Sequence, residues 1–394
     1  MSEDSRAGRV VLYASVGPVL TRYGLDVDAA TLTAGESVTL PANVQYAWPH
    51  VSGRFLYVAS SNGASGLGAA GDRHHISAFR IDPVSGALTP HGAPIALPTR
   101  PIHIATDRTS RHILAAFSHP ASFHIYRIND DATPGDEVAQ GEPVDSGIYP
   151  HQVLPTPDNR RVILVTRGHS AAGSKAEEPG ALKVFAYADG QLSDAVSVAP
   201  DGGYGFGPRH IDFHPTEPWI YVSLERQNAL AMFGMADGVV SARPLFSTTT
   251  LADPGGARTR QLAGTVHVHP NGRFVYAVNR ASETTDFAGR AVFAGGENSF
   301  AVYAIDPASG EPRLIQHIDT GGIHCRTFHI DPSGRLLVGA HVMGMAVRDG
   351  SGVREVAANL AVFRIGADGR LSFVRRYDVA VGERTMFWMG MVGL

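Results

Sequence analysis

Short apolar runs separated by polar turns recur along the whole chain. A typical unit opens on a polar residue, continues as a β-type run, turns at Pro or Asp with Gly, Asn or Arg, and returns as a second apolar run. Such a turn between two apolar runs indicates a β-hairpin. The unit occurs in full at residues 45–60, 102–117, 151–166, 209–224, 264–279 and 326–341.

Each unit is followed by an alternating strand and a polar turn, which together supply two further strands. These segments span residues 76–88, 124–138, 182–192, 230–240, 300–314 and 360–371. The resulting period of about 50 to 60 residues is typical of a propeller blade with generous loops and is longer than most solenoid repeats.

The two ends of the chain complement one another. The run at 384–389 matches the start of an inner strand at 326–328, and residues 10–14 and 20–32 supply the strands that would follow it. We therefore predict an all-β fold, a seven-bladed β-propeller with four antiparallel strands per blade, as a single domain over residues 1–394. The N- and C-terminal strands would close the last blade and leave no open edge. Separate β-sandwich domains are the alternative, but no linker divides the units.

Composition agrees with many short strands and excludes several classes of protein. The chain has 44 Gly, 25 Pro and 44% hydrophobic residues without a low-complexity tract. We expect no membrane partner and a cytoplasmic setting, because no apolar run is long enough to span a bilayer and the first residues lack the features of a secretory signal. A net charge of -4 argues against a nucleic-acid partner. Oligomeric state is not indicated.

In a propeller the inner strand of each blade starts at one face and the second strand returns to it. Two sets of equivalent positions should therefore meet at the mouth of the central channel, where function is often located. The start of the inner strand gives Gln45, Ile102, His151, Arg209, Gly264, Arg326 and Arg384. The position just past the second strand gives Ser61, Ser118, Arg167, Glu225, Arg280 and Val342.

Arginines are concentrated in these two sets. The guanidinium group is a fixed fork of donors that matches a carboxylate or phosphate, so the cluster predicts an anionic ligand. We expect Arg209 and Arg280 to bind this ligand with help from Arg167 and Arg326. Any one of them could instead pair with backbone carbonyls or acids between blades, and Arg384 fits such a role at the closing seam.

His151 and Glu225 form a plausible acid/base pair. His151 can exchange a proton near neutral pH, and Glu225 can do so if its pKa is raised, or can orient a partner. With 18 histidines in the chain, a structural role for His151 is the alternative. His103 and His210 occupy equivalent positions one residue inside the mouth and could form hydrogen bonds behind the site or between blades.

The remaining chemical features favour structural roles. His267 and His269 alternate on a strand, but no third ligand accompanies them, so we expect no metal. No phosphate-binding or dinucleotide-binding loop appears, so no cofactor is expected. Cys325, the only cysteine, excludes an intrachain disulfide. As a neighbour of Arg326 it could be a low-pKa nucleophile, although a buried thiol is favoured.

Several segments resemble one known family. Gly-Pro-Arg-His at 207–210, Phe-His-Pro at 213–215 and Tyr-Val-Ser-Leu-Glu at 221–225 resemble the lactonase-type seven-bladed propellers, which include 6-phosphogluconolactonase and the fungal carboxymuconate cyclase. The likeness extends to segments 102–107, 150–151, 278–280 and 379–382 and covers essentially the whole chain. Cys-Arg-Thr at 325–327 replaces a Pro-Arg-His, and the loops at 170–179 and 282–298 look specific to this chain. These differences concern the substrate rather than the scaffold.

The resemblance implies an enzyme, a metal-independent lactonase that hydrolyses, or forms by the reverse reaction, a small lactone bearing a carboxylate or phosphate. A carboxymuconate-type cycloisomerase and a non-catalytic propeller that binds a metabolite or protein are the alternatives. In the cyclase branch the site is a histidine, two arginines and a glutamate. The matching positions, which we expect to be catalytic, are His151, Arg209, Glu225 and Arg280. The residues expected to bind substrate are Arg167, Arg326, His103, His210 and Asn228.

Overall fold

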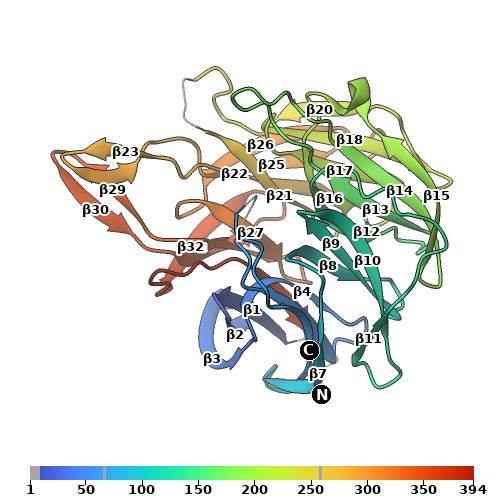
Figure 1. The fold of residues 1–394 in the computed structure, drawn as a ribbon. Coiled ribbons are helices and arrows are strands. Elements are labelled where there is room, and N and C mark those ends of the chain that lie inside the picture. Colours follow the sequence, from blue (N-terminus) through green and yellow to red (C-terminus); the bar gives the residue numbers. More distant parts are fainter. Residues whose placement is uncertain (1–8, 65–67, 257–259) are drawn as a thin grey trace, which may run out of the picture.

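The computed structural model describes residues 9–64, 68–256 and 260–394. Its strands form seven sheets of four or five antiparallel strands, which follow one another in chain order from blue to red (Figure 1). The predicted seven-bladed propeller is therefore confirmed. Among the described residues, no helix is long and apolar enough to cross a lipid bilayer.

The first blade is made from both ends of the chain, as predicted. It contains β33 (Met389–Gly393), β1 (Val10–Val16), β2 (Val19–Asp26) and β3 (Thr31–Thr39). Strand β33 pairs antiparallel with β1, from Val10 opposite Gly393 to Ala14 opposite Met389. This pairing supplies the inner strand of the closing blade and joins the two termini.

The other six blades are continuous in sequence. The first three contain β4 (Asn43–Pro49), β5 (Phe55–Ser61), β6 (His74–Ile81) and β7 (Leu88–Ala96); β8 (Pro101–Thr106), β9 (His112–Ser118), β10 (Ala121–Ile128) and β11 (Pro134–Glu137); and β12 (Pro150–Pro155), β13 (Arg161–Thr166), β14 (Ala181–Ala188) and β15 (Gln191–Val198). The last three contain β16 (Pro208–Phe213), β17 (Trp219–Leu224), β18 (Ala229–Ala236), β19 (Val239–Val240) and β20 (Phe246–Thr249); β21 (Leu262–Val268), β22 (Phe274–Arg280), β25 (Ser299–Ile305) and β26 (Pro312–Asp319); and β27 (Cys325–Ile330), β28 (Leu336–His341), β31 (Asn359–Ile365) and β32 (Leu371–Asp378). A short 3-10 turn spans Pro200–Gly203.

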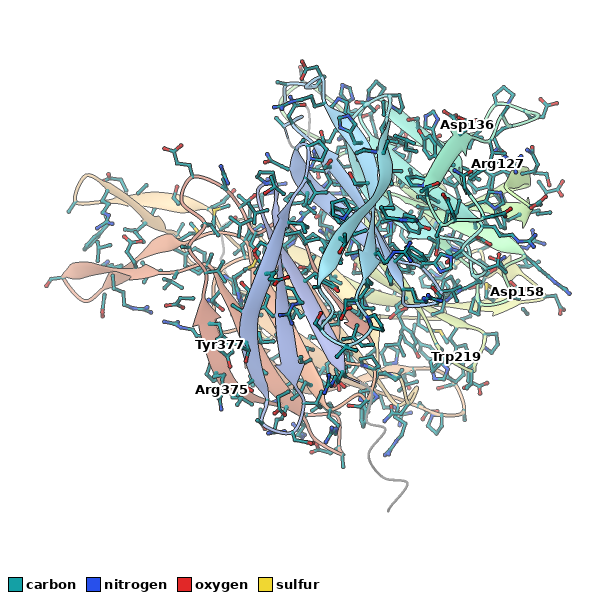
Figure 2. All side chains as sticks on the ribbon, turned by 90° about the horizontal axis from the view of Figure 1, so that it is seen from below. Arg127, Asp136, Asp158, Trp219, Arg375 and Tyr377 are labelled. Carbon is teal, nitrogen blue, oxygen red and sulfur yellow. The ribbon has the colours of Figure 1, made fainter. Side chains whose placement is uncertain are left out.

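Burial follows the position of a strand within its blade. The second strands β9 and β28 are buried along their whole length, because neighbouring blades cover both of their faces. Outer strands such as β7 and β15 are mostly exposed. Side chains of the outer half of a blade, such as Arg127 on β10 and Arg375 on β32, stand out into solvent (Figure 2). The hydrophobic core accordingly lies between blades.

Repeated hydrogen bonds join one blade to the next. The buried hydroxyl of Tyr13 donates to the carbonyl of Gly86 at 2.7 Å, and the hydroxyl of Tyr221 donates to the carbonyl of Gly310 at 2.8 Å. Tyr276 makes the same contact with Gly369 at 2.9 Å. These tyrosines lie at equivalent places in the repeat, so the polar tip of each aromatic side chain is satisfied by the following blade.

Two extra hairpins project from the propeller on the left of Figure 1. They are β23 (Thr284–Phe287) with β24 (Arg290–Phe293), and β29 (Met345–Asp349) with β30 (Gly352–Val356). A small apolar cluster that includes Ile323, Met345 and Phe293 packs between them. Each hairpin connects the second strand of a blade to its third, so it emerges at the end of the blade where the predicted mouth positions lie.

Candidate active site

A β-bulge marks the start of the inner strand in six blades. The register between inner and second strand shifts there, so one residue, or two in the blade of β21, has no opposite partner. The skipped residues are Gln45, Ile102, His151, Arg209, Gly264 with Thr265, and Arg326. These are the positions that the repeat placed at the mouth. A bulge turns a side chain away from the regular alternation, which is how His151, Arg209 and Arg326 are directed out of their sheets.

In three blades the residue two positions before the bulge forms a backbone hydrogen bond with the residue just past the second strand. The carbonyls of Tyr149, Gly207 and His324 accept hydrogen bonds from the backbone N–H of Arg167, Glu225 and Val342, at 3.0, 2.8 and 3.3 Å. The second predicted set of positions is thereby tied to the inner strands. Tyr149 and His324 both have a left-handed backbone, with φ of 57°, which is uncommon for residues other than glycine.

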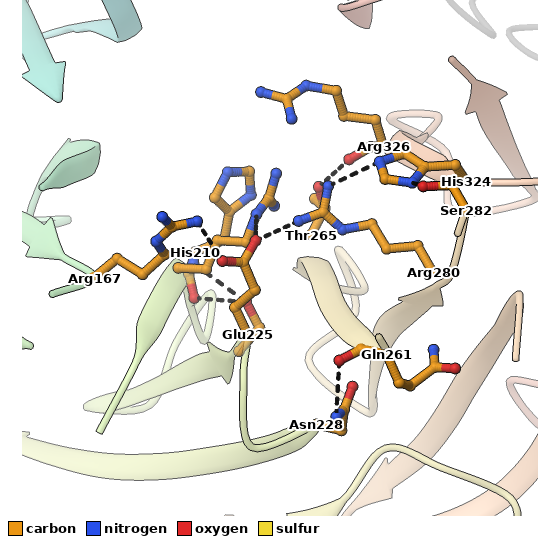
Figure 3. Close-up of polar contacts among 12 residues, drawn as sticks. Arg167, His210, Glu225, Asn228, Gln261, Thr265, Arg280, Ser282, His324 and Arg326 are labelled. Carbon is orange, nitrogen blue, oxygen red and sulfur yellow. Dashed lines mark hydrogen bonds and ion pairs between the residues drawn. The ribbon is translucent and has the colours of Figure 1, made fainter. Parts of the chain in front are cut away.

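The carboxylate of Glu225 lies at the centre of the site and joins three blades (Figure 3). Its Oε2 accepts a hydrogen bond from Nη1 of Arg167 at 2.6 Å, and its Oε1 accepts one from Nη2 of Arg280. Nε of Arg209 is 3.1 Å from Oε1. That contact is an ion pair without hydrogen-bond geometry, because Nε and Nη1 of Arg209 are buried without a hydrogen-bond partner among the described residues.

Glu225 is ionised in this environment. Burial alone would raise the pKa of Glu225, but the charges of Arg280, Arg167 and Arg209 outweigh burial and lower that pKa to about 2. A carboxylate held in this state accepts hydrogen bonds and does not donate a proton near neutral pH. The geometry therefore favours the second possibility raised by the sequence, that Glu225 orients its partners.

His324 holds Arg280 from the other side. Its Nε2 is 3.4 Å from Nη1 of Arg280, and its Nδ1 is 2.9 Å from Oγ of Ser282. Arginine can only donate, so Nε2 is the acceptor and the ring proton is on Nδ1, directed to Ser282. Burial and the charge of Arg280 hold the pKa of His324 well below its usual value, which agrees with this neutral tautomer.

His151 lies beside two other buried imidazoles, whose rings are tilted or edge-on to one another. Its ring centroid is 5.2 Å from that of His210, which is 6.3 Å from that of His103. Nδ1 of His151 is buried without a hydrogen-bond partner among the described residues. Burial, followed by the charge of Arg209, holds the pKa of His151 well below its usual value, so the ring is neutral and keeps a lone pair at neutral pH.

A small cavity of about 10 Å³ lies beside these groups. It is lined by His151, Arg209, His210, Arg326 and Phe387, together with Gln45, Tyr46, Ile102 and Thr327. A volume of this size corresponds to about one water molecule. The cavity therefore offers a place for a single small reactant within the reach of a neutral histidine and two arginines.

Arg326 and Arg167 each lie over an aromatic ring at the edge of the site. The Cζ atom of Arg326 is 3.7 Å from the ring centroid of Phe387, and that of Arg167 is 4.1 Å from the ring centroid of Tyr149. Arg100 approaches Phe387 as well, at 5.5 Å. Stacking fixes the orientation of a guanidinium and leaves its N–H groups free to meet a ligand.

Other residues singled out from the sequence lie in different surroundings. Nδ2 of Asn228 donates to the carbonyl of Gln261 at 3.2 Å, and Figure 3 shows this contact apart from the Glu225 carboxylate. Asn228 has a left-handed φ of 49° in the turn between two strands. That turn directs its side chain to the junction with the next blade rather than to His151. Arg384 is exposed.

His269 and Cys325, for which the sequence left a chemical role open, lie in structural surroundings. Nε2 of His269 contacts the carbonyl of Gly334 at 2.8 Å in the next blade. Within the described ranges, no group of three or more His, Cys, Asp and Glu side chains is placed to hold a metal ion. Cys325 is buried, and burial raises its pKa to about 12, so it is a neutral thiol and not an activated nucleophile.

The two long loops both touch the site. Glu177, in the loop at 170–179, forms an ion pair with Arg226 at 3.4 Å, next to Glu225 in the chain. In the loop at 282–298, Oδ1 of Asn298 accepts the backbone N–H of His324 at 2.8 Å, and Ser282 holds its ring. These loops therefore support residues of the site.

Sequence reasoning missed Arg100, Tyr149, His324 and Phe387. The first three share one register position, two residues before the bulge, where the other blades have Asn43, Gly207 and Leu262. The same repeat, extended two residues upstream, would have placed Arg100, Tyr149 and His324 at the mouth. Phe387 stands at the equivalent bulge position of the closing blade, because the N–H of Gly17, the first residue past β1, donates to the carbonyl of Thr385 at 3.1 Å, as the N–H of Arg167 does to Tyr149. The alignment of the repeats puts Arg384 at that position, three residues too early.

The sequence is similar to known proteins over most of its length. A family model described as "Lactonase, 7-bladed beta-propeller" matches residues 13–348. The chain is 25% identical to a 6-phosphogluconolactonase of Bacillus subtilis over 328 residues, covering 81% of this chain and 83% of that protein. It is 26% identical to a 6-phosphogluconolactonase of Cronobacter sakazakii over 357 residues, covering 89% and 90%.

Solved structures share the fold. The periplasmic gluconolactonase PpgL of Pseudomonas aeruginosa superposes with a TM-score of 0.73 at 21% sequence identity, covering 98% of this chain and 99% of that one. At this level of identity the likeness concerns the arrangement of blades. Propellers carry many activities on one scaffold, so the chemistry has to be argued from the site.

Proposed function

The chain belongs to the lactonase family of seven-bladed β-propellers and is a lactone-hydrolysing enzyme, and on that premise we propose that its arginine-rich mouth is the active site. The substrate proposed is a small lactone that carries a carboxylate or phosphate group. The observation that supports this most strongly is the meeting of Arg167, Arg209 and Arg280 on the Glu225 carboxylate beside a neutral His151.

His151 is proposed as the general base. A water molecule in the small cavity would give a proton to the free ring nitrogen of His151 while its oxygen attacks the lactone carbonyl carbon. The ring C–O bond then breaks, and the protonated His151 returns the proton to the departing alkoxide. The product is the open hydroxy acid, and His151 is neutral again.

Arg209 and Arg280 are proposed to stabilise the charge that develops on the carbonyl oxygen. Donors that are fixed in place before the reaction stabilise such a charge more than mobile ones, because they need no reorganisation. Glu225 fixes both guanidinium groups, so its role here is to position them. Nε and Nη1 of Arg209, which have no hydrogen-bond partner among the residues that the structure describes, are the donors that an incoming oxyanion would meet.

An anionic substrate would also activate the base. Arg209, Arg326 and Arg167 contribute to the low pKa of His151, so a bound carboxylate or phosphate that offsets their charges raises that pKa towards neutrality. His151 would then become a stronger base only when the substrate is bound. This coupling favours an anionic substrate over a neutral lactone.

We propose that no metal ion takes part, because the arginines supply the positive charge that a Lewis acid would otherwise provide. The alternatives are the reverse lactonisation, a carboxymuconate-type cyclisation and a binding role without turnover. The same base and oxyanion groups would serve the reverse lactonisation, since forward and reverse reactions share one transition state, whereas a carboxymuconate-type cyclisation needs a proton donor to carbon.

A panel of sugar-phosphate lactones and aromatic-catabolism lactones, with the product identified by NMR, tests the proposal. We expect hydrolysis of an anionic lactone at a rate that exceeds its spontaneous opening and that survives treatment with EDTA. Loss of activity on chelation would refute metal independence, and formation of a lactone from the acid as the favoured direction would support the cyclase. No turnover of any lactone would leave a binding function.

A further inference from the structure

Two guanidinium groups in the site have no carboxylate partner in the described part of the chain. Arg167, Arg209 and Arg280 share Glu225. The guanidinium groups of Arg326 and Arg100 make no hydrogen bond or ion pair with any described residue, and Nε of Arg100 is buried without a partner. In Figure 3 no dashed line reaches the guanidinium group of Arg326, and the hydrogen bond drawn to this residue is the one that its backbone carbonyl accepts from Oγ1 of Thr265 at 3.0 Å.

The two free arginines meet on one aromatic ring. Cζ of Arg326 is 3.7 Å and Cζ of Arg100 is 5.5 Å from the ring centroid of Phe387. Arg326 is the bulge residue of its blade, Arg100 precedes the bulge of another, and Phe387 leads into the closing strand. Three blades therefore bring two positive charges to one place.

Burial makes this arrangement costly without a ligand. Arg100 is only 8% exposed. Burial, Arg280 and Arg100 together lower the pKa of Arg326 to about 9, so Arg326 is still charged at neutral pH and feels the charge of its neighbours. Buried charges are normally paired, and an oxyanion bound between these two guanidinium groups would supply the missing partner.

We propose that Arg100 and Arg326, held against Phe387, form a second anion subsite that binds the carboxylate or phosphate carried by the substrate. This inference rests on the proposed lactonase function for the identity of the ligand. Arg326 and Phe387 also line the small cavity beside His151, so the subsite is adjacent to the reacting carbonyl. Two pairs of arginines then have different roles. Arg209 and Arg280 contact the oxygen of the reacting carbonyl, and Arg100 and Arg326 contact the carboxylate or phosphate of the substrate.

A matched arginine elsewhere serves as a control. Arg80 also lies over a phenylalanine, with Cζ 5.1 Å from the ring centroid of Phe55, but it is exposed and contacts His91 at 3.4 Å. If Arg100 served packing alone, Arg100→Gln would lower the stability of the protein more than Arg80→Gln, but neither would change the response to anions. If Arg100 binds an oxyanion, only its replacement would change the response to anions.

The first experiment compares hydrolysis of 6-phosphoglucono-δ-lactone with that of glucono-δ-lactone, which lacks the phosphate. Arg100→Gln should lower the ratio of the two kcat/KM values by about 10- to 100-fold, the range for one lost hydrogen bond to a charged group. Arg326→Gln should lower the ratio similarly and slow both lactones, because Arg326 borders the cavity. Arg80→Gln should leave the ratio within about twofold. An unchanged ratio in Arg100→Gln would overturn the subsite.

A second experiment is independent of turnover. Inorganic phosphate and acetate are titrated into the protein while its melting temperature and binding heat are followed. The subsite predicts saturable binding of at least one of these anions to the wild type and to Arg80→Gln, with the affinity lost in Arg100→Gln and Arg326→Gln. Preference for phosphate or for acetate identifies the substrate's oxyanion. Equal binding by all four proteins refutes the subsite even if the lactonase activity is established, and retained binding without turnover refutes only the proposed function.

Discussion

Nη1 of Arg167 donates a hydrogen bond to Oε2 of Glu225 at 2.6 Å across the boundary between two blades. The residues are 58 positions apart in the chain, yet each is the first residue after the second strand of its blade. Arg280 ends β22, the corresponding strand of the blade that follows Glu225 in the chain, and it forms an ion pair with the same carboxylate. The electrostatic centre of the site is therefore built from equivalent positions of consecutive repeats.

Replacing Glu225 by Gln should weaken both the fold and the catalysis. Removing one partner of a buried ion pair typically costs about 3–5 kcal/mol, and three arginines lose their anchor here. The folded-state pKa of about 2 lies below the unfolded value, so the stability from the ionised group is present above about pH 4.5 and is lost as pH falls towards 2. Urea denaturation should show a large stability deficit in Glu225→Gln at pH 7 and a smaller one at pH 3. A deficit independent of pH would contradict the ionised state.

Arg280→Lys should lower kcat/KM by about 100- to 1,000-fold, the range for loss of one oxyanion donor. Lysine keeps the charge but cannot contact Glu225 and His324 at the same time, because it lacks the planar fork. The matched control is Arg313→Lys, an exposed residue that pairs with Glu311 at 3.1 Å, which should keep activity within about twofold. Full activity in Arg280→Lys would show that charge alone is sufficient.

The repeat in the sequence predicts much of this arrangement. Polar starts and hairpin turns gave the inner strands, and their alignment placed His151, Arg209 and Arg326 in one set of positions and Arg167, Glu225 and Arg280 in another. The complementary ends predicted the pairing of β33 with β1. The sequence predicts these features because the same register is repeated along the chain, so an alignment of the repeats identifies polar residues at positions that are otherwise apolar.

Other features depend on backbone geometry that no residue pattern marks. The bulges at His151 and Arg209 each follow a proline, but those at Gln45, Gly264 and Arg326 do not, so proline does not mark them consistently. The position two residues before the bulge carries Arg100 in one blade and Gly207 in another, so residue type does not mark this position. The ionisation of Glu225 could not be assigned either, since burial and three opposing charges act in opposite directions and only their distances decide the outcome.

Buried neutral histidines should make the protein labile to acid. Burial lowers the pKa of His103 to about 3 and the pKa values of His329 and His341 to about 4. These pKa values lie below the unfolded value near 6.5, so the unfolded chain binds more protons than the folded one between about pH 6.5 and 4. The free energy of unfolding therefore decreases as pH is lowered through this window, by up to about 1.4 kcal/mol per pH unit for each histidine. Thermal melts between pH 7 and 4.5 should show this decline.

His341→Gln tests that origin of acid lability. The variant should be less stable at pH 7, because Nε2 of His341 contacts Oγ1 of Thr320 at 3.0 Å. It should also lose stability less steeply than the wild type as pH falls. A decline in stability of the same slope in wild type and His341→Gln would mean that His341 does not titrate on unfolding in this window.

Cys325 should be unreactive in the folded protein. Its thiol is buried and its pKa is raised to about 12, so the thiolate population at pH 8 is very small. Iodoacetamide should not modify the native enzyme within an hour at pH 8, whereas the urea-unfolded chain should react. Rapid alkylation of the native protein with loss of activity would instead restore a nucleophilic role for Cys325.

The turnover of His151→Ala tests most directly whether the arginine-rich mouth is a catalytic site. Single-turnover kinetics on an anionic lactone should be combined with the Kd of the hydroxy-acid product, measured by calorimetry on protein whose folding is checked by circular dichroism. We predict that kcat falls by about 10²- to 10⁴-fold, the usual contribution of a general base, while the Kd of the product changes by no more than about threefold. An unchanged kcat in a folded variant would contradict the assignment of His151 and, with it, the proposed mechanism.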